Sequence, residues 1–316
     1  MIGSCSAYHL YAGTEFTAFN VHSKTGGVTT ASFSDTTAPG VATIAFAERN
    51  GLDDWGYAPR VWLGAQITDK WGFRGRYWRL GDSDLHRPTL NPAIPTVGSN
   101  FATFEQSDTL DAWTADAEGV RSFEFGKWKG DMFVGGRHAE YASSSSFLGF
   151  GVFTTGNFIN LTLQNRGQFE GSGVTYGGQL RRQVSKHVYM FGTARGSALD
   201  GHADALGRSD GTVASSPSAP LVGAATVTRN DADARMYIWE LQAGVEFEFA
   251  LQDLPANYFF RVAYEYQNWD IDCPPTGGAG FGGTIGELTT NSFSSANASN
   301  AGMVLNGITL GTGLTW

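Results

Sequence analysis

The chain has 316 residues, including 42 glycines, with 13% aromatic and only 16% charged residues. A disordered chain would be richer in charge and poorer in aromatics, and a helical domain would be weakened by this much glycine. The net charge of −9 disfavours a nucleic-acid partner. Length and composition are compatible with one large all-β domain.

Alternation of apolar and polar residues begins in the first quarter of the chain. Residues 60–67 place apolar side chains at odd positions and put Arg60 on the even face. Residues 71–77 repeat the pattern, with Arg74 and Arg76 on the even face. Successive side chains of a strand point to opposite faces, so both segments are predicted strands with one apolar and one charged face.

The clearest alternation lies in the last third of the chain. Residues 235–251 have apolar side chains at odd positions and glutamates such as Glu246 at even positions. Residues 257–269 place Arg261 on the face opposite an aromatic stripe, and residues 302–316 alternate apolar residues with glycine and threonine. A helix would scatter both sets around its circumference, so these segments are predicted strands.

Tight and long connections alternate along the chain. The predicted tight turns are Thr68-Asp69-Lys70, Lys129-Gly130-Asp131, Ser185-Lys186 and Asp253–Ala256, and the predicted long loops are 21–54, 81–111, 143–168, 200–233 and 270–300. Four of the five lysines lie beside tight turns, and every tryptophan except Trp62 lies near a strand end, as interfacial aromatic belts require. Short turns on one side and long loops on the other are typical of outer-membrane barrels.

We therefore predict an all-β fold in which residues 1–316 form a single domain, a closed antiparallel transmembrane β-barrel with short periplasmic turns and long extracellular loops. Ten strands are expected, near 7–20, 56–68, 70–81, 112–128, 131–142, 168–184, 186–199, 234–251, 257–269 and 302–316. A hairpin of 147–153 with 158–164 would project beyond the membrane or raise the count to twelve. Arg121 falls on the expected lipid face, which a bulge or a place near the interface would explain, and the faces of 188–198 stay unassigned.

The ends of the chain bear on export. No signal peptide begins at Met1, although a bacterial outer-membrane barrel must be exported, so we expect that the leader has been removed or is not included. Ile2-Gly3-Ser4-Cys5 is a weak match to the end of a lipoprotein signal, and whether Cys5 is lipidated stays open. Cys5 and Cys273 resemble no metal motif.

Three stretches resemble a known family. They are Trp71-Gly72-Phe73-Arg74-Gly75-Arg76-Tyr77-Trp78, Phe191–Ser197 and the closing Gly307–Trp316. They are similar to the Legionella-type pore-forming major outer-membrane proteins of Gram-negative bacteria, which are abundant in Planctomycetes. The resemblance implies an outer-membrane location and pore formation. Trp316 resembles the terminal aromatic read by the barrel-assembly machinery, although phenylalanine is commoner there.

The polar faces of the predicted strands form the expected lumen. The expected lumen-lining residues are Glu15, Arg60, Arg74, Arg76, Asp116, Glu118, Glu124, Arg137, Gln179, Arg181, Arg195, Glu240, Glu246, Glu248, Arg261 and Glu265. In one interpretation these residues line a water-filled pore and set its selectivity. In the other they pair across a narrow lumen, since unpaired charges away from water are costly and ten strands enclose little space.

The uncharged stretch from Ala142 to Asn165 carries several aromatic residues. Exposed apolar patches often mark interfaces, so a contact with a second copy of the chain or with a surface partner is one hypothesis. Packing over the barrel mouth is the other. The residues of this predicted contact loop are Phe147, Phe150, Phe153 and Phe158.

Signs of catalysis or cofactor binding are weak. Gly278-x-Gly280-x-x-Gly283 matches a dinucleotide fingerprint but lies in a loop without strand-to-helix context. The sequence has no Gly-x-Ser-x-Gly elbow, and the histidines are dispersed. We therefore expect no enzyme activity, no cofactor and no metal site.

Two functions stay open at this point. The first is a porin-like barrel for passive diffusion of ions or small solutes. The alternative is a non-conducting structural or interaction barrel whose extracellular loops bind partners or build the cell-surface layer. The expected partners are outer-membrane lipid and, through Trp316, the assembly machinery. A soluble β-sandwich is a third fold compatible with the alternation.

Overall fold

The computed structural model describes residues 9–24, 28–35, 42–49, 53–85, 91–92, 99–153, 158–214, 222–251, 255–272, 278–285, 288–295 and 301–316. The regular structure of these residues is all strand. In this part of the chain no helix has the length and apolar character needed to cross a membrane. Cys5 and Cys273 lie outside the described residues.

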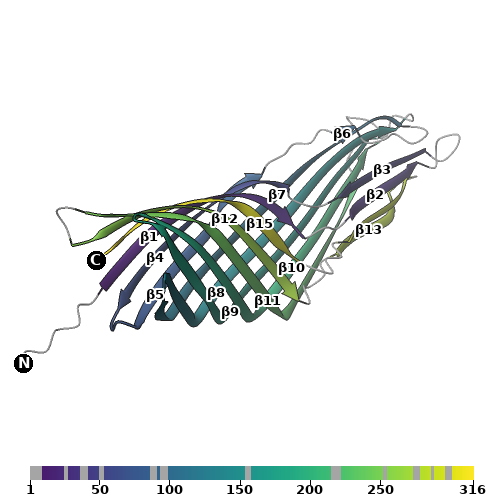
Figure 1. The fold of residues 1–316 in the computed structure, drawn as a ribbon. Helices are drawn as coiled ribbons and strands as arrows, with labels where there is room; N and C mark the ends of the chain where they lie inside the picture. Colours follow the sequence, from purple (N-terminus) through teal and green to yellow (C-terminus); the bar gives the residue numbers. More distant parts are fainter. Residues whose placement is uncertain are drawn as a thin grey trace, which may run out of the picture.

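Ten strands pair side by side into a closed antiparallel ring (Figure 1). Around the ring they are β1 (His9–Ser23), β4 (Asp53–Gln66), β5 (Trp71–Leu85), β7 (Ser99–Phe125), β8 (Trp128–Phe153), β9 (Phe158–Ser185), β10 (Val188–Ala214), β11 (Val222–Ala250), β12 (Asn257–Asp272) and β15 (Ala301–Thr315). The first and last strands pair with each other, and β5 pairs with β7. The predicted ten-stranded barrel is confirmed.

The seam between β1 and β15 reaches the last residue of the chain. The backbone N–H of Trp316 donates to the carbonyl of Leu10 over 2.8 Å. The imidazole Nδ1 of His9 lies 2.9 Å from the carbonyl oxygen of Trp316, and the carbonyl can only accept. These contacts extend the pairing of β1 with β15 to the end of the seam where the two chain ends meet.

Short turns join the strands at one end of the barrel. Gly126 and Lys127 connect β7 to β8, and Gly126 has φ of +60°. A two-residue hairpin loop needs a positive φ, which glycine adopts without a steric penalty. The predicted turn at Lys129-Gly130-Asp131 was therefore wrong: the turn lies at Gly126 and Lys127, and residues 129–131 already belong to β8.

Five neighbouring strands, β7 to β11, project far beyond the others (Figure 1). β11 has 29 residues, whereas a membrane-crossing strand needs about 9–11. The segments 81–111, 143–168 and 200–233 were predicted as long loops, and much of each is strand instead. Val152 pairs with Phe158, so the extra hairpin is a continuation of β8 and β9 and the barrel count stays at ten.

A separate four-stranded sheet lies beside these projecting strands (Figure 1). Its order is β13 (Gly278–Ile285), β14 (Leu288–Ser295), β2 (Val28–Asp35) and β3 (Ala42–Arg49). β13 and β14 lie in the connection of β12 to β15, and β2 and β3 lie in the connection of β1 to β4. The strand order of this sheet therefore matches the order β12, β15, β1, β4 in the barrel. β13 contacts β10 and β11, and β3 contacts β7 and β8. The two-residue β6 (Asn91–Pro92) pairs with β7.

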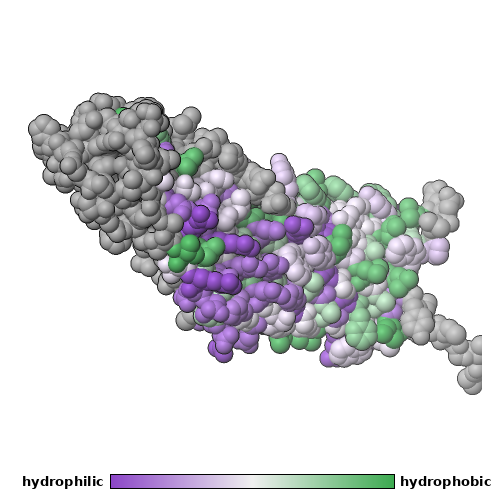
Figure 2. All heavy atoms as spheres, turned by 180° about the vertical axis from the view of Figure 1, so that it is seen from behind, coloured by the Kyte–Doolittle hydropathy of each residue, from purple (hydrophilic) through white to green (hydrophobic). Residues whose placement is uncertain are grey.

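The outer face of the barrel carries an apolar belt that ends at one level. Large apolar side chains on this face are half or more exposed, including Leu63, Phe73, Met132, Val134, Val174, Met190, Leu241, Tyr264 and Ile308. Above the belt, at a level that we call the rim, outward positions become polar or charged: Arg235 lies in register with Asp200, and Asp200 with Ser172. Figure 2 shows hydrophilic residues gathered across the middle of one face and hydrophobic ones nearer the end with the termini.

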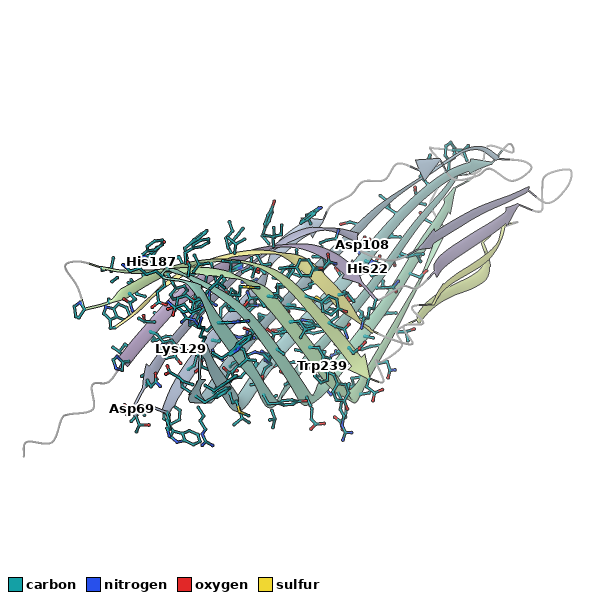
Figure 3. All side chains as sticks on the ribbon, in the orientation of Figure 1. His22, Asp69, Asp108, Lys129, His187 and Trp239 are labelled. Atoms are coloured by element: carbon teal, nitrogen blue, oxygen red, sulfur yellow. The ribbon has the colours of Figure 1, made fainter. Side chains whose placement is uncertain are left out.

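The turn end and the far end of the short strands can be followed in Figure 3. Asp69, Lys129 and His187 lie near the turns, whereas His22 and Asp108 lie toward the projecting strands.

Below the charged rim the apolar belt requires a lipid environment, because an apolar surface of this extent is not stable in water. The fold is that of a membrane β-barrel.

Candidate functional site in the barrel lumen

The structure brings most of the predicted lumen residues together inside the barrel. The buried ones are Glu15, Arg60, Asp116, Glu118, Arg137, Arg195, Glu240, Glu246, Arg261 and Glu265, and the partly buried ones are Arg74, Arg76, Gln179, Arg181 and Glu248. Glu124 is the exception. Its carboxylate is 69% exposed at the turn end, 3.3 Å from the ammonium of Lys129.

Direct cross-strand register creates the ion pairs. Neighbouring strands place opposite charges directly opposite each other, an arrangement that stabilises a sheet. The register pairs are Glu15 with Arg60, Arg74 with Glu118, Arg76 with Asp116, Asp116 with Arg137, Arg195 with Glu240, and Glu246 with Arg261. Register therefore brings these pairs together, while other ion pairs, such as Arg76 with Glu240, join strands that are not neighbours and so cross the lumen.

Glu240 is the centre of one part of the network. Its carboxylate accepts hydrogen bonds from Arg76 at 2.8 and 2.9 Å and lies 2.7 Å from a guanidinium nitrogen of Arg137. Asp116 accepts from the same two arginines, at 2.8 Å from Arg76 and 2.6 Å from Arg137. Two carboxylates and two guanidinium groups from β5, β7, β8 and β11 thus share one cluster across the lumen.

Arg60 and Arg261 form the second part of the network. Arg60 donates to Glu15 over 2.5 Å and also to Glu265. Arg261 lies 3.2 Å from Glu15 and 3.0 Å from Glu246. The guanidinium carbon of Arg261 also lies 4.7 Å from the ring centroid of Phe259, so a cation–π contact adds to its ion pairs.

Glu118 completes the network on the β5–β8 side. It accepts hydrogen bonds from Arg74 at 2.6 Å and from Arg195. Both guanidinium groups also lie over the ring of Phe133, with the carbon of Arg74 at 4.6 Å and that of Arg195 at 4.4 Å from its centroid. A cation–π contact therefore adds to the ion pairs of both arginines.

The network is electrically balanced. It contains seven arginines (Arg60, Arg74, Arg76, Arg137, Arg181, Arg195, Arg261) and seven carboxylates (Glu15, Asp116, Glu118, Glu240, Glu246, Glu248, Glu265). A buried charge needs a partner with good geometry because it has lost its hydration. The equal numbers of arginines and carboxylates, and their direct contacts, therefore favour mutual pairing over a charged lining that selects passing ions.

A second layer of the lumen is apolar, and the sequence reasoning missed it. Beyond the charges, toward the projecting strands, lies a cluster of side chains with little or no exposure to solvent: Phe19, Val21, Trp78, Leu80, Leu110, Tyr141, Phe169, Leu199, Met236, Ile238, Trp269, Ile271, Met303 and Leu305. Trp78 and Trp269 had been counted among the interfacial belts because they lie near strand ends. That was wrong, since each is only 1% exposed inside the barrel.

The apolar layer arises because the residues at inward positions change from charged to apolar along a strand, while the same alternate positions keep facing the lumen. On β10, Arg195 points inward below the rim, and above it Leu199 points inward while Asp200 points outward. Lipid surrounds the lower part of the barrel, so apolar side chains turn outward there. Water surrounds the upper part, so apolar side chains turn inward as in a soluble protein.

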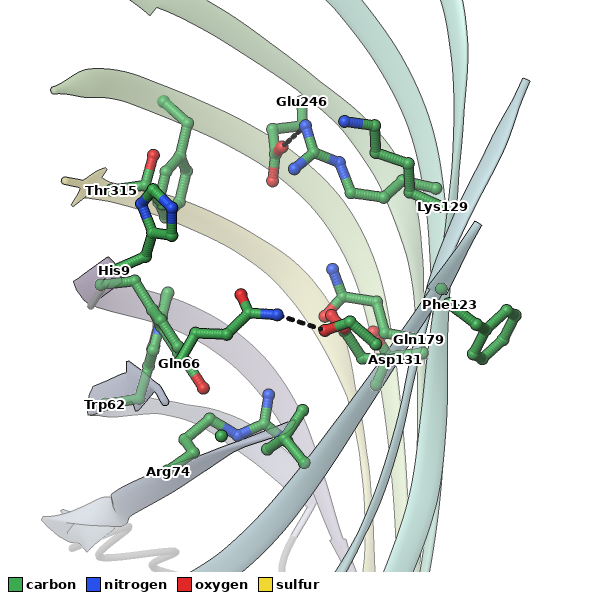
Figure 4. Close-up of a pocket in the computed structure, with 18 of the residues that line it drawn as sticks. His9, Trp62, Gln66, Arg74, Phe123, Lys129, Asp131, Gln179, Glu246 and Thr315 are labelled. Carbon is green, nitrogen blue, oxygen red and sulfur yellow. Dashed lines mark hydrogen bonds and ion pairs between the residues drawn. The ribbon is translucent and has the colours of Figure 1, made fainter. Parts of the chain in front are cut away.

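A cavity of about 740 Å³ occupies the turn end of the lumen (Figure 4). Its lining includes Trp62, Gln66, Arg74, Gln179 and Glu246, and also Phe123, whose ring points outward in Figure 4. The charge network lies at its inner end, since Arg60, Arg76 and Arg195 also line it. Trp62, the one tryptophan that was not predicted to lie near a strand end, therefore faces the lumen.

The predicted contact loop is not a loop. Phe150 belongs to β8 and Phe158 to β9, and their ring centroids are 6.2 Å apart. Phe147 and Phe153 also fall on β8, but their side chains lie outside the described residues. The described part of the chain contains no cluster of three or more histidine, cysteine, aspartate or glutamate residues arranged to hold a metal ion.

Comparison with known proteins gives structural likenesses only. No protein-family model and no curated protein matches the chain. The outer membrane protease OmpT of Escherichia coli is similar with a TM-score of 0.40 and 10% identity over 98% of this chain and 96% of its own. A Pseudomonas aeruginosa FadL homologue (TM-score 0.29, 8% identity, 98% and 90% covered) and the Pseudomonas putida toluene transporter TodX (0.29, 9%, 99% and 90%) are also similar. The fold assignment rests on the strand pairing and apolar belt of this chain.

Proposed function

We propose that the chain is an outer-membrane barrel with a closed lumen, and that the wall projecting beyond the membrane carries out its function at the cell surface. This is the second of the two functions that the sequence left open. Passive diffusion, the first, requires a continuous aqueous passage, and the filled lumen argues against one.

The observation that carries the proposal is the double filling of the lumen. Arg137 and Trp78, one from each layer, are 2% and 1% exposed. Water does not reach side chains buried to this degree, so neither layer offers a wetted path. A barrel of ten strands is narrow enough to be filled by its own side chains.

The size of the projecting wall supports a surface role. A strand of 27 residues, such as β10, is about 90 Å long, roughly three times the thickness of the hydrocarbon core. A chain that served only to cross the membrane would not need this length. Many outward side chains above the rim are polar, and several are paired, as in the bond of Arg229 to Asp204 over 3.1 Å, which suits exposure to water.

Outer-membrane location is part of the proposal; the resemblance to the Legionella-type family stays a prediction, and the pore formation that it implies is not part of the proposal. Closed barrels with short turns at one end and an apolar belt are built for the outer membranes of Gram-negative bacteria. In that orientation the turns face the periplasm and the projecting strands face the medium. An interaction of Trp316 with the assembly machinery and a contact of the projecting wall with another copy or a surface protein remain predictions.

Single-channel conductance of the purified protein in a planar bilayer tests the closed lumen. We expect no stable conductance steps from protein that is shown to be folded by heat-modifiable gel mobility. A swelling assay in vesicles should likewise show no entry of small sugars. Stable steps whose ion selectivity changes when Arg74 or Glu246 is neutralised would establish a pore and overturn the proposal.

A further inference from the structure

The same arrangement of residues occurs twice at the turn end of the barrel. Trp71 pairs in register with Arg121 on the next strand, and Trp128 pairs in register with Arg182. The guanidinium carbon lies over the indole ring in both, at 5.3 Å for Arg121 and 5.4 Å for Arg182. We call these two units the Trp–Arg pairs.

A lysine precedes the tryptophan in each unit and is fixed by the same backbone contact. The carbonyl of Lys70 accepts from the N–H of Ser122, which follows Arg121, over 2.8 Å. The carbonyl of Lys127 accepts from the N–H of Gln183, which follows Arg182, over 3.4 Å. Each unit therefore brings an exposed lysine of a tight turn close to an exposed arginine.

Both arginines face the membrane side of the wall without a carboxylate. Arg121 and Arg182 are exposed, and neither forms an ion pair with any residue that the structure describes. Their neighbours on the outer face are apolar: Met132, opposite Arg121, is 60% exposed, and Met190, opposite Arg182, is 57% exposed. An exposed cation without a carboxylate partner at the edge of an apolar belt is well placed to bind an anion from outside the chain.

The acidic residues at this end are placed differently. Asp69, Asp131 and the exposed Glu124 line the cavity at the turn end, together with Lys70 and Lys129. Arg121 and Arg182 therefore lie on the outer face beside indole rings, whereas exposed arginines at the opposite rim, such as Arg235 and Arg229, pair with the carboxylates of Asp200 and Asp204.

We propose that the two Trp–Arg pairs are binding sites for the phosphate of anionic phospholipids in the leaflet at the turn end. A planar guanidinium donates two parallel hydrogen bonds to a phosphate. The indole ring suits the boundary between hydrocarbon and headgroup. The inference needs the protein to be in a membrane and does not depend on whether the lumen is closed.

Native mass spectrometry of the protein in micelles that contain equal amounts of phosphatidylglycerol and phosphatidylcholine tests the proposal. We expect the wild-type chain to retain phosphatidylglycerol preferentially. The variant R121Q/R182Q should lose this preference, by about fivefold for each arginine removed, since one cation near a lipid surface contributes about that factor. R235Q, which removes an exposed arginine at the opposite rim, is the matched control and should retain the preference.

The proposal is overturned if the wild-type chain retains both lipids equally or if R121Q/R182Q binds phosphatidylglycerol as the wild type does. A loss of equal size in R235Q would also overturn it, because net charge alone would then explain the preference. Inorganic phosphate in excess should not displace the lipid, and displacement would assign the sites to free anions instead. If the double variant does not fold, R121Q and R182Q are measured singly, each with an expected partial loss.

Discussion

Trp78 and Trp269 pack against each other inside the barrel, with ring centroids 5.5 Å apart and ring planes at 36°. Their strands, β5 and β12, are not neighbours, because β4, β1 and β15 lie between them. The contact therefore crosses the lumen instead of following the wall. Phe19 meets the edge of the Trp78 ring at 6.4 Å and extends the contact to β1.

The coupling between these two tryptophans can be measured. W78A and W269A should each destabilise the barrel by about 3–5 kcal/mol, the usual cost of removing a buried tryptophan. In a double-mutant cycle the pair should show a coupling of about 1 kcal/mol, because the rings touch. The free energy of unfolding in lipid vesicles gives both values. The pair of Trp78 with Trp239, which is 49% exposed on the outer face, is the control and should show no coupling.

Neutralising Glu240 tests the charge layer. E240Q removes the carboxylate that Arg76 and Arg137 share and should lower the free energy of unfolding by about 3–5 kcal/mol, since buried guanidinium groups are then left without compensation. E248Q should cost about 1 kcal/mol or less, because Glu248 is 24% exposed and Glu246 also pairs with its partner Arg181. Equal costs for both variants would contradict the network as described.

The barrel, its ten strands and the inward charges were predictable because side chains alternate with period two. Alternation put Arg76 and Glu240 on the inner face, and the structure joins them by an ion pair. The same parity places Trp78 beside Arg76 and Trp269 beside Gln267 on the inner face. The apolar layer was therefore predictable from the sequence. It was missed because Trp78 and Trp269 were assigned to the interfacial belts by their nearness to strand ends and not to the inner face by their alternation.

The projecting wall was less predictable. Strand residues above the rim are mostly polar on the outer face and often small inside, as along Ala203, Ala205, Gly207, Ser209 and Gly211 of β10. Such a pattern lacks the apolar stripe that identifies a membrane strand, so it looks like a loop. The pairing of β10 with β9 and β11 supplies the order, and sequence alone does not contain that long-range register.

Gly311 controls the approach of two ion-paired side chains. It lies on β15 between Glu15 and Arg261, and a Cβ there would sit 2.7 Å from Cγ of Glu15 and 2.8 Å from Cγ of Arg261. G311A should therefore destabilise the barrel by about 1–3 kcal/mol, the usual cost of overpacking. G75A, whose Cβ would approach nothing closer than 3.9 Å, is the control and should be near neutral in the same unfolding assay.

Cysteine labelling locates the inner end of the cavity. Thr193 and Ser197 both point inward on β10, on either side of Arg195. Thr193 lines the cavity, whereas Ser197 is 4% exposed and donates to Thr175 over 3.0 Å. After Cys5 and Cys273 are replaced by serine, T193C should react with a hydrophilic maleimide and S197C should not, because water ends at the charge layer.

The comparison of T193C with S197C separates the two functions that the sequence left open. A diffusion pore would wet both positions, and the two thiols would then be modified at similar rates. E170C, at an exposed position on the outer face above the rim, serves as the accessible reference for the reagent. Modification of S197C at the rate of that reference would show that water passes the level of Arg195, and the closed lumen would have to be abandoned.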